Sequence, residues 1–234
     1  MKKILCLSVL ALCLSNAQAT NKAKFLDPAQ INLQQILSAP AAPDSATSKD
    51  ELAILHQIQS SRSKAQVSKA QSDETLKNIF LYQNVLGEKF NSANFPITSK
   101  FSKHIKKDVH LATQSAKLSF HRIRPYNLDK TLAPVCETKT VDNSYPSQHS
   151  TLAWVYASVL IEMVPQNRDA ILARAEDYAH NRLVCGAHFP SDVIAGRRLA
   201  EAIFHAMYAS PAFQQELKKA RNEIRAFYMQ PAQP

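Results

Sequence analysis

Three short polar clusters between residues 117 and 192 carry side chains that together could bind and transfer a phosphoryl group. They supply three cations, two histidines, a hydroxyl and a carboxylate. The clusters are Lys117 with Arg124-Pro125, then Pro146-Ser147-Gln148-His149, and then Arg182 with His188 and Asp192. Cations bind phosphate oxygens, and an imidazole can attack phosphorus or exchange a proton. The combination predicts an anion site with histidine chemistry, which no single cluster would indicate.

The first cluster has the spacing of one helix face. Lys117 and Arg124 are seven residues apart, close to two α-helical turns, so both side chains would point the same way. We predict a helix over residues 99–124 that stops at Pro125. Long cationic side chains on one face could converge on a single anion. His121 falls on the same predicted face, where packing is the favoured interpretation and tuning of the anion site the alternative.

The second cluster lies where another helix is predicted to begin. Ser147 follows a helix-stopping proline, Pro146, and is expected to act as the N-cap. Free backbone N–H groups and the helix dipole at such a start favour a bound phosphate. His149 in the first turn would then lie close to that phosphate.

The third cluster repeats this arrangement. Pro190 suits the first turn of a helix, which puts His188 at its entry and Asp192 just inside. Four residues apart, the carboxylate could hold one imidazole nitrogen and leave the other free to attack. Arg182 ends the preceding predicted helix and adds a planar fork suited to phosphate oxygens.

The elements that must position these clusters are predicted to be helical. Ser48 followed by Glu51 has the pattern of a capping box and predicts a helix over residues 48–62. Residues 151–164 are apolar almost all round, which is typical of a central buried helix. No strand alternation, no repeat and only three glycines occur. We predict an all-α, single-domain helical bundle with a buried central helix. Its remaining parts are helices over 75–86, 167–184, 190–209 and 213–228, a loop over 91–98 and an irregular segment over 126–145.

The N-terminus has the pattern of a secretory signal peptide. Lys2 and Lys3 precede an apolar run over 4–14, and Ala17-Gln18-Ala19 forms a small-residue cleavage site. The run is too short to span a bilayer, although an uncleaved anchor is the alternative. We expect a signal peptide over 1–19, an extended arm over 20–47 and the functional domain over 48–234. No membrane span is expected after cleavage, and the predicted location is periplasmic or secreted.

Cysteine and charge content narrow the interpretation further. Cys6 and Cys13 would leave with the signal peptide, so the mature chain keeps Cys136 and Cys185. A pair in a secreted protein favours one disulfide, with two separate buried thiols as the alternative. The formal net charge of +9 would attract anionic substrates. Without RNA-type aromatic motifs or a helix-turn-helix signature, nucleic acid is not expected as the partner.

Taken in order, the clusters resemble the signature of the type-2 phosphatidic acid phosphatase superfamily. The matching patterns are Lys-x6-Arg-Pro, Pro-Ser-x-His and Arg-x5-His-x3-Asp. More specifically, the chain resembles the bacterial class A non-specific acid phosphatases. The resemblance covers most of the predicted mature chain, from the helix near Glu51 to the segment Pro211-Ala212-Phe213-Gln214-Gln215.

This resemblance implies a covalent mechanism without a metal ion or another cofactor. His188 would be the nucleophile, Asp192 would orient it, and His149 would be the general acid and then the base. The phosphate would be bound by Lys117, Arg124, Ser147, Arg182 and backbone N–H groups that include that of Gln148. The family usually has glycine at the position of Gln148 and serine at that of Asn181, so the substrate range or rate is expected to differ.

The sequence therefore predicts a metal-independent acid phosphatase that acts on small phosphomonoesters. We expect an acidic optimum, because His149 must carry a proton, and inhibition by inorganic phosphate or vanadate. A homo-oligomer is left open. Three alternatives remain: a lipid phosphate phosphatase, a vanadate-dependent haloperoxidase, and a catalytically impaired phosphate-binding protein.

Overall fold

The computed structural model describes residues 22–228, and the predicted signal peptide lies outside this range. Within the range every regular element is helical, which confirms the all-α class. The α-helices are α1 (Leu33–Ile36), α2 (Ala46–Ser61), α3 (Lys64–Thr75), α4 (Gln83–Leu86), α5 (Pro96–Phe120), α6 (Pro125–Leu128), α7 (Gln148–Met163), α8 (Arg168–Val184), α9 (Pro190–Tyr208) and α10 (Pro211–Tyr228). Short 3₁₀ helices are η1 (Pro28–Gln30), η2 (Ile79–Tyr82) and η3 (Pro165–Asn167).

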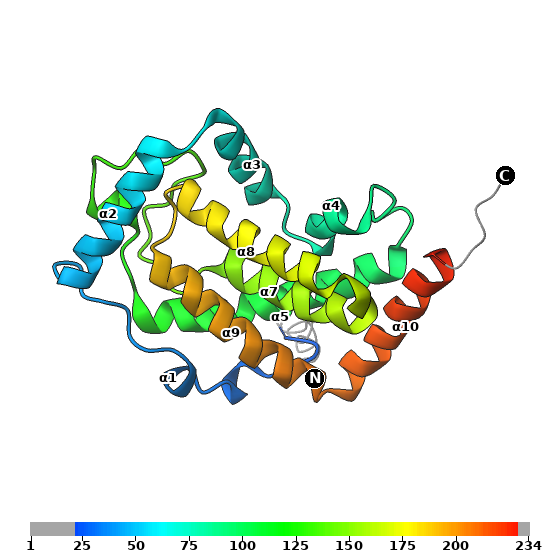
Figure 1. Ribbon diagram of the computed structural model, residues 1–234. Coiled ribbons are helices and arrows are strands. Elements are labelled where there is room, and N and C mark those ends of the chain that lie inside the picture. The colour runs from blue at the N-terminus through cyan, green and yellow to red at the C-terminus, as the bar shows by residue number, and fades with distance from the viewer. Residues whose placement is uncertain (1–21, 229–234) are drawn as a thin grey trace, which may run out of the picture.

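Helix α7 is the buried centre of the bundle, as its apolar sequence predicted. It packs against α5, α8, α9 and α10, which surround it in Figure 1. The contact with α9 is so close that a Cβ atom on Gly196 would lie 2.7 Å from the carbonyl oxygen of Ser147. Glycine at this position therefore lets the second turn of α9 approach the start of α7.

Helix α5 differs from the prediction at both ends. Pro96 opens the helix at its first position, where a missing N–H costs nothing, so the segment expected as a loop contributes a turn. The helix ends at Phe120, because His121 adopts a left-handed conformation with φ of 45°. Arg124 therefore caps α6 rather than ending α5. The prediction that Lys117 and Arg124 share one helix is wrong, and the exposed His121 is a helix terminator.

Helix α2 also begins at a different residue from the one that the sequence predicted. Its N-cap is Ser45, whose side chain accepts the N–H of Ser48, so Ser48 lies inside the helix. Glu51 therefore does not cap its own helix, and its side chain is buried. Residues 66–74 belong to α3, and the helix expected over 75–86 is divided into η2 and α4.

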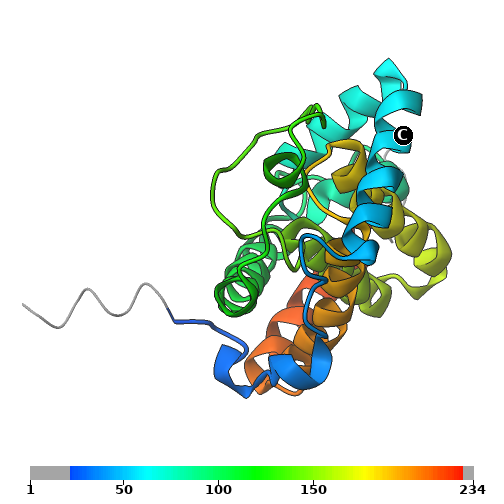
Figure 2. The same cartoon turned by 90° about the vertical axis from the view of Figure 1, so that its left-hand side faces the viewer.

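Residues 22–45 run along the outside of the bundle, beside α9 in Figure 2. Their Phe25 and Leu37 side chains are buried in the main core. The carboxylate of Asp108 on α5 accepts backbone N–H groups of three consecutive residues, 24–26. Tyr145 donates a hydrogen bond to the carbonyl oxygen of Ser38 at 2.7 Å. This arm is thus attached both to the core and to the segment that precedes α7.

None of the helices within residues 22–228 has both the length and the apolar content that crossing a membrane would require.

Candidate active site

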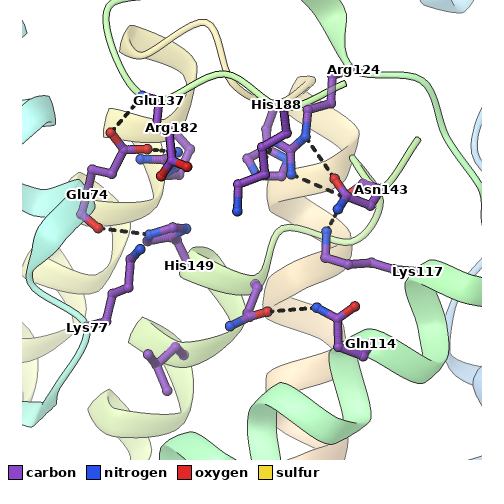
Figure 3. Close-up of a pocket in the computed structure, with 13 residues that line it drawn as sticks. Glu74, Lys77, Gln114, Lys117, Arg124, Glu137, Asn143, His149, Arg182 and His188 are labelled. Atoms are coloured by element: carbon purple, nitrogen blue, oxygen red, sulfur yellow. Dashed lines mark hydrogen bonds and ion pairs between the residues drawn. The ribbon is translucent and has the colours of Figure 1, made fainter. Parts of the chain in front are cut away.

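One cavity of about 110 Å³ gathers side chains from all three polar clusters (Figure 3). Of the residues singled out from sequence, those that line it are Lys117, Arg124, Gln148, His149, Arg182 and His188. Ser147 and Asp192 lie directly behind them and are fully buried. The fold therefore brings together every residue of the predicted phosphate site.

The starts of α7 and α9 are joined where this cavity forms. The backbone N–H of Ser147 donates to the carbonyl oxygen of Asp192 at 2.9 Å. Ser147 also caps α7, as predicted, by accepting the N–H of Ser150. Ser150 in turn donates to the carbonyl oxygen of Val193 at 2.9 Å. These bonds hold the two histidine-bearing segments in a fixed relation.

The hydrogen bonds of His188 define its tautomer. Its Nδ1 lies 3.4 Å from a carboxylate oxygen of Asp192, and its Nε2 lies 3.4 Å from a guanidinium nitrogen of Arg124. A carboxylate accepts and a guanidinium only donates, so Nδ1 carries the proton and Nε2 presents a lone pair. Burial, reinforced by the charge of Arg124, lowers the pKa of His188 to about 3. The imidazole is therefore neutral over the ordinary pH range.

Asp192 is held as a carboxylate. Burial by itself would raise its pKa, but the hydrogen bond from His188 and the charge of Arg122 bring the pKa down to about 2. One oxygen also accepts the hydroxyl of Ser144 at 2.6 Å and the N–H of Phe189 at 2.9 Å. With these bonds the carboxylate can orient the His188 ring.

Two cations meet at Asn143, a residue that the sequence gave no reason to select. Lys117 donates to its backbone carbonyl oxygen, and Nε of Arg124 donates to its side-chain oxygen at 3.0 Å. Burial, and then the charge of Arg124, lowers the pKa of Lys117 to about 7. Asn143 comes from the irregular segment before α7, where no periodic pattern marks it. It aligns both cations although they lie on different helices.

The opposite wall of the cavity is formed by the end of α3 and the segment that follows it. The carboxylate of Glu74 lies 3.3 Å from Arg182, and its backbone carbonyl lies 3.2 Å from Nε2 of His149. Since a carbonyl only accepts, Nε2 of His149 carries a proton. Burial, together with the charges of Arg182 and Lys77, lowers the pKa of His149 well below its ordinary value. Sequence reasoning missed Glu74 and Lys77, because they lie outside the motifs.

Arg182 occupies a buried position at the end of α8. Its Nε has no hydrogen-bond partner within residues 22–228. A buried donor without a partner is costly, so this nitrogen is well placed for an anion. Its neighbour Asn181 donates to Asp73 at 2.7 Å and so attaches α3 to α8. The replacement for the family's usual serine therefore supports the wall that carries Glu74.

The side chain of Gln148 bends toward α5. Its oxygen lies 3.2 Å from Nδ1 of His110 and 3.5 Å from Nε2 of Gln114. Its backbone is helical, at the first position of α7. This conformation is open to any amino acid, so the backbone N–H that glycine would offer is retained.

A disulfide joins Cys136 to Cys185, with Cα atoms 5.2 Å apart. It is the pairing that the sequence favoured over two separate thiols. The bond ties the irregular segment before α7 to the end of α8, and Sγ of Cys185 lies 3.4 Å from Arg182. Two walls of the cavity are thereby covalently linked.

Residues 109–216 match the model of the PAP2 superfamily. This stretch contains all three clusters, so the superfamily that the motifs resembled is confirmed for it. The chain is also 36% identical over 60% of its length to the non-specific acid phosphatase of Providencia stuartii, and 34% identical over 65% to that of Salmonella typhi. The matched regions span 60% and 63% of those relatives.

A solved structure shares the fold. It is a transmembrane PAP2-type phosphatidylglycerolphosphate phosphatase from Bacillus subtilis, with a TM-score of 0.53 and 19% sequence identity. The similarity covers 70% of this chain and 85% of that one. At this identity the likeness concerns the helical arrangement alone.

Proposed function

We propose that this chain is a metal-independent acid phosphatase that hydrolyses small phosphomonoesters through a phosphohistidine. The observation that carries the proposal is the state of His188. It is neutral and held by Asp192, with its Nε2 lone pair facing a cavity that Lys117, Arg124 and Arg182 line. The similarity to acid phosphatases over about three fifths of the chain supports the same activity.

In the first step, Nε2 of His188 attacks phosphorus and the bond to the ester oxygen breaks. His149 gives its proton to the departing alkoxide, which leaves as an alcohol. The phosphorylated ring carries positive charge that the Asp192 carboxylate stabilises through Nδ1. In the second step, His149 takes a proton from water while the oxygen attacks phosphorus. The P–N bond breaks, and inorganic phosphate and neutral His188 are released.

The charges around the cavity explain how His149 would acquire its proton. In the free enzyme, burial and the nearby cations lower its pKa. A phosphate anion among these cations offsets their repulsion and raises the pKa of His149 again. Protonation is then coupled to substrate binding and is favoured at acidic pH, as the sequence-based expectation of an acidic optimum requires.

The lining of the cavity favours small polar esters over lipids. Leu152 is the one apolar side chain among the lining residues in the described part of the chain. An acyl chain would therefore find little apolar surface beside the phosphate site. We further propose the division into signal peptide, arm and domain given above, with a periplasmic or secreted location.

The decisive experiment compares wild type, His188→Ala and His205→Ala on an aryl phosphate, from acidic to mildly basic pH. His205 is an exposed residue of α9 and serves as the matched control. We expect His188→Ala to lose turnover, and the alkali-stable, acid-labile ³²P that is bound through histidine should disappear. Substantial turnover by His188→Ala would refute the nucleophile assignment. Vanadate-dependent halide oxidation by a phosphatase-negative wild type would favour the haloperoxidase instead.

A further inference from the structure

A chain of buried ion pairs lies behind the candidate nucleophile. Nη2 of Arg122 lies 2.7 Å from a carboxylate oxygen of Glu51, and Nη1 lies 2.7 Å from Oδ1 of Asp192. The other oxygen of Asp192 contacts His188. Four side chains from α2, the α5–α6 connection, α9 and the α8–α9 loop thus form one continuous line.

All members of this line are withdrawn from solvent. The exposed fractions of the Glu51, Arg122 and Asp192 side chains are 8%, 5% and 0%. Arg122 also lies 4.0 Å from the centre of the Phe189 ring, which fixes its guanidinium plane. Because removing one partner of a buried pair leaves an uncompensated charge, each charge here depends on the other two.

Glu51 has a second contact that reaches the same place. Its other carboxylate oxygen accepts the N–H of Ser191 at 2.6 Å, and Arg122 donates to the Ser191 hydroxyl at 2.7 Å. Ser191 directly precedes Asp192 in the first turn of α9. Glu51 and Arg122 therefore determine both the position of this turn and the charge that Asp192 presents.

We propose that Glu51 and Arg122 are positioning residues that keep the charge of Asp192 available to His188. This inference rests on the proposed function. One arginine shared by two carboxylates leaves the trio with a net negative charge. Without the charge of Glu51, Arg122 would neutralise Asp192 alone. The Asp192 carboxylate would then stabilise the positive phosphohistidine less well.

The charge of Asp192 matters because two cationic side chains also act on His188. Arg124 and Lys117 both act on the imidazole as cations, and Asp192 is the carboxylate that opposes them. Weakening Asp192 leaves the two cations unopposed at the moment when the ring itself becomes positive. The loss should appear in the chemical step rather than in phosphate binding, because Glu51 and Arg122 do not line the phosphate cavity.

The test replaces Glu51 by Gln, which keeps the shape and one acceptor oxygen but removes the charge and the second acceptor. Asp50→Asn, an exposed neighbour on the same helix, is the matched control. We expect Glu51→Gln to lower kcat about tenfold, with the Ki for inorganic phosphate changed by less than about twofold. The proton NMR resonance of His188 Nδ1–H should move upfield, as its bond to Asp192 weakens. Asp50→Asn should change none of these quantities.

A second variant keeps the inference testable if Glu51→Gln does not fold. Arg122→Lys retains the charge but loses the fork that spans both carboxylates, so its kcat should fall while its phosphate Ki stays near the wild-type value. The inference is overturned if folded Glu51→Gln keeps wild-type kcat and the Nδ1–H resonance. It is equally overturned if kcat and phosphate affinity fall together with an unchanged resonance. An inactive wild type would instead refute the proposed function, while the resonance would still test whether Glu51 and Arg122 keep the charge of Asp192 available to His188.

Discussion

The carboxylate of Glu74 lies 3.3 Å from the guanidinium of Arg182, in the wall of the cavity where a substrate phosphate would bind. The free protein thus already supplies one anion to this cation. A phosphate that enters must share Arg182 with Glu74. The pair sets a balance between anion affinity and the charge felt by His149, which Glu74 contacts through its backbone carbonyl.

Replacing Glu74 by Gln is expected to separate these two effects. Arg182 loses its competing carboxylate, so the Ki for inorganic phosphate should fall several-fold, by up to about tenfold or 1.4 kcal/mol. The stronger field of Arg182 should lower the pKa of His149 further, so kcat should fall as well. Inhibition kinetics and kcat at one acidic pH provide the measurement. Weaker phosphate binding in Glu74→Gln than in the exposed control Glu176→Gln would contradict this view.

The pKa of Lys117 predicts how kcat/KM changes on the alkaline side of the pH profile. Its pKa is lowered to about 7, so the amine is charged below that pH and becomes neutral above it. Because kcat/KM reports the free enzyme, it should decline as pH rises through about 7. A bound phosphate favours the charged amine, so the decline in kcat should occur at higher pH.

The matched variants for this pH dependence are Lys117→Met and Lys100→Met, the latter exposed on the same helix. Lys117→Met should have low kcat/KM without this alkaline decline, whereas Lys100→Met should follow wild type. A decline that persists unchanged in Lys117→Met would assign it to another group.

Gln148→Gly tests the position at which the chain departs from the pattern of the family that it resembles. The backbone N–H is present with either residue, so kcat on a small ester should stay within about threefold. The contacts with His110 and Gln114 would be lost, and glycine would cost up to about 1 kcal/mol of stability relative to alanine. Gln148→Ala is the control, and thermal unfolding separates the two. A large gain in kcat for glycine but not alanine would mean that backbone freedom matters.

The disulfide is expected to stabilise the walls of the site. Cys136 and Cys185 are 49 positions apart, for which the chain-entropy model gives about 4 kcal/mol. The double variant Cys136→Ser with Cys185→Ser should unfold at a lower denaturant concentration, and reductant should then have no further effect. Equal unfolding midpoints for wild type with and without reductant would show that the bond contributes little.

The sequence predicted the fold class, the central helix and those cavity residues that belong to the motifs, because apolar periodicity and short motifs can be recognised locally. The prediction failed at the end of α5, because the backbone angle of a single residue determines where that helix stops. The left-handed His121 ends α5 early, so Lys117 and Arg124 reach the cavity from two elements instead of one. Helix periodicity was expected to bring Lys117 and Arg124 together. They come together instead because the chain turns at His121, between α5 and α6.

The supporting residues were harder to find than the motif residues. Asn143, Glu74 and Glu51 act through contacts with partners that are 19, 108 and 71 positions away in the chain. Such distances leave no periodic trace, and a carboxylate such as Glu51 in a helix start is more simply interpreted as part of a cap. Only the three-dimensional structure distinguishes a capping residue from a buried ion pair.

The position of α2 and α3 has a practical consequence for any attempt to isolate the minimal enzyme. The stretch that matches the superfamily model begins at residue 109, yet Glu51, Asp73 and Glu74 lie before it. A fragment cut at that boundary would keep every signature residue while losing one of the two carboxylates that pair with Arg122, and one wall of the cavity. The stretch that matches the superfamily model is therefore shorter than the part of the chain that forms the complete site.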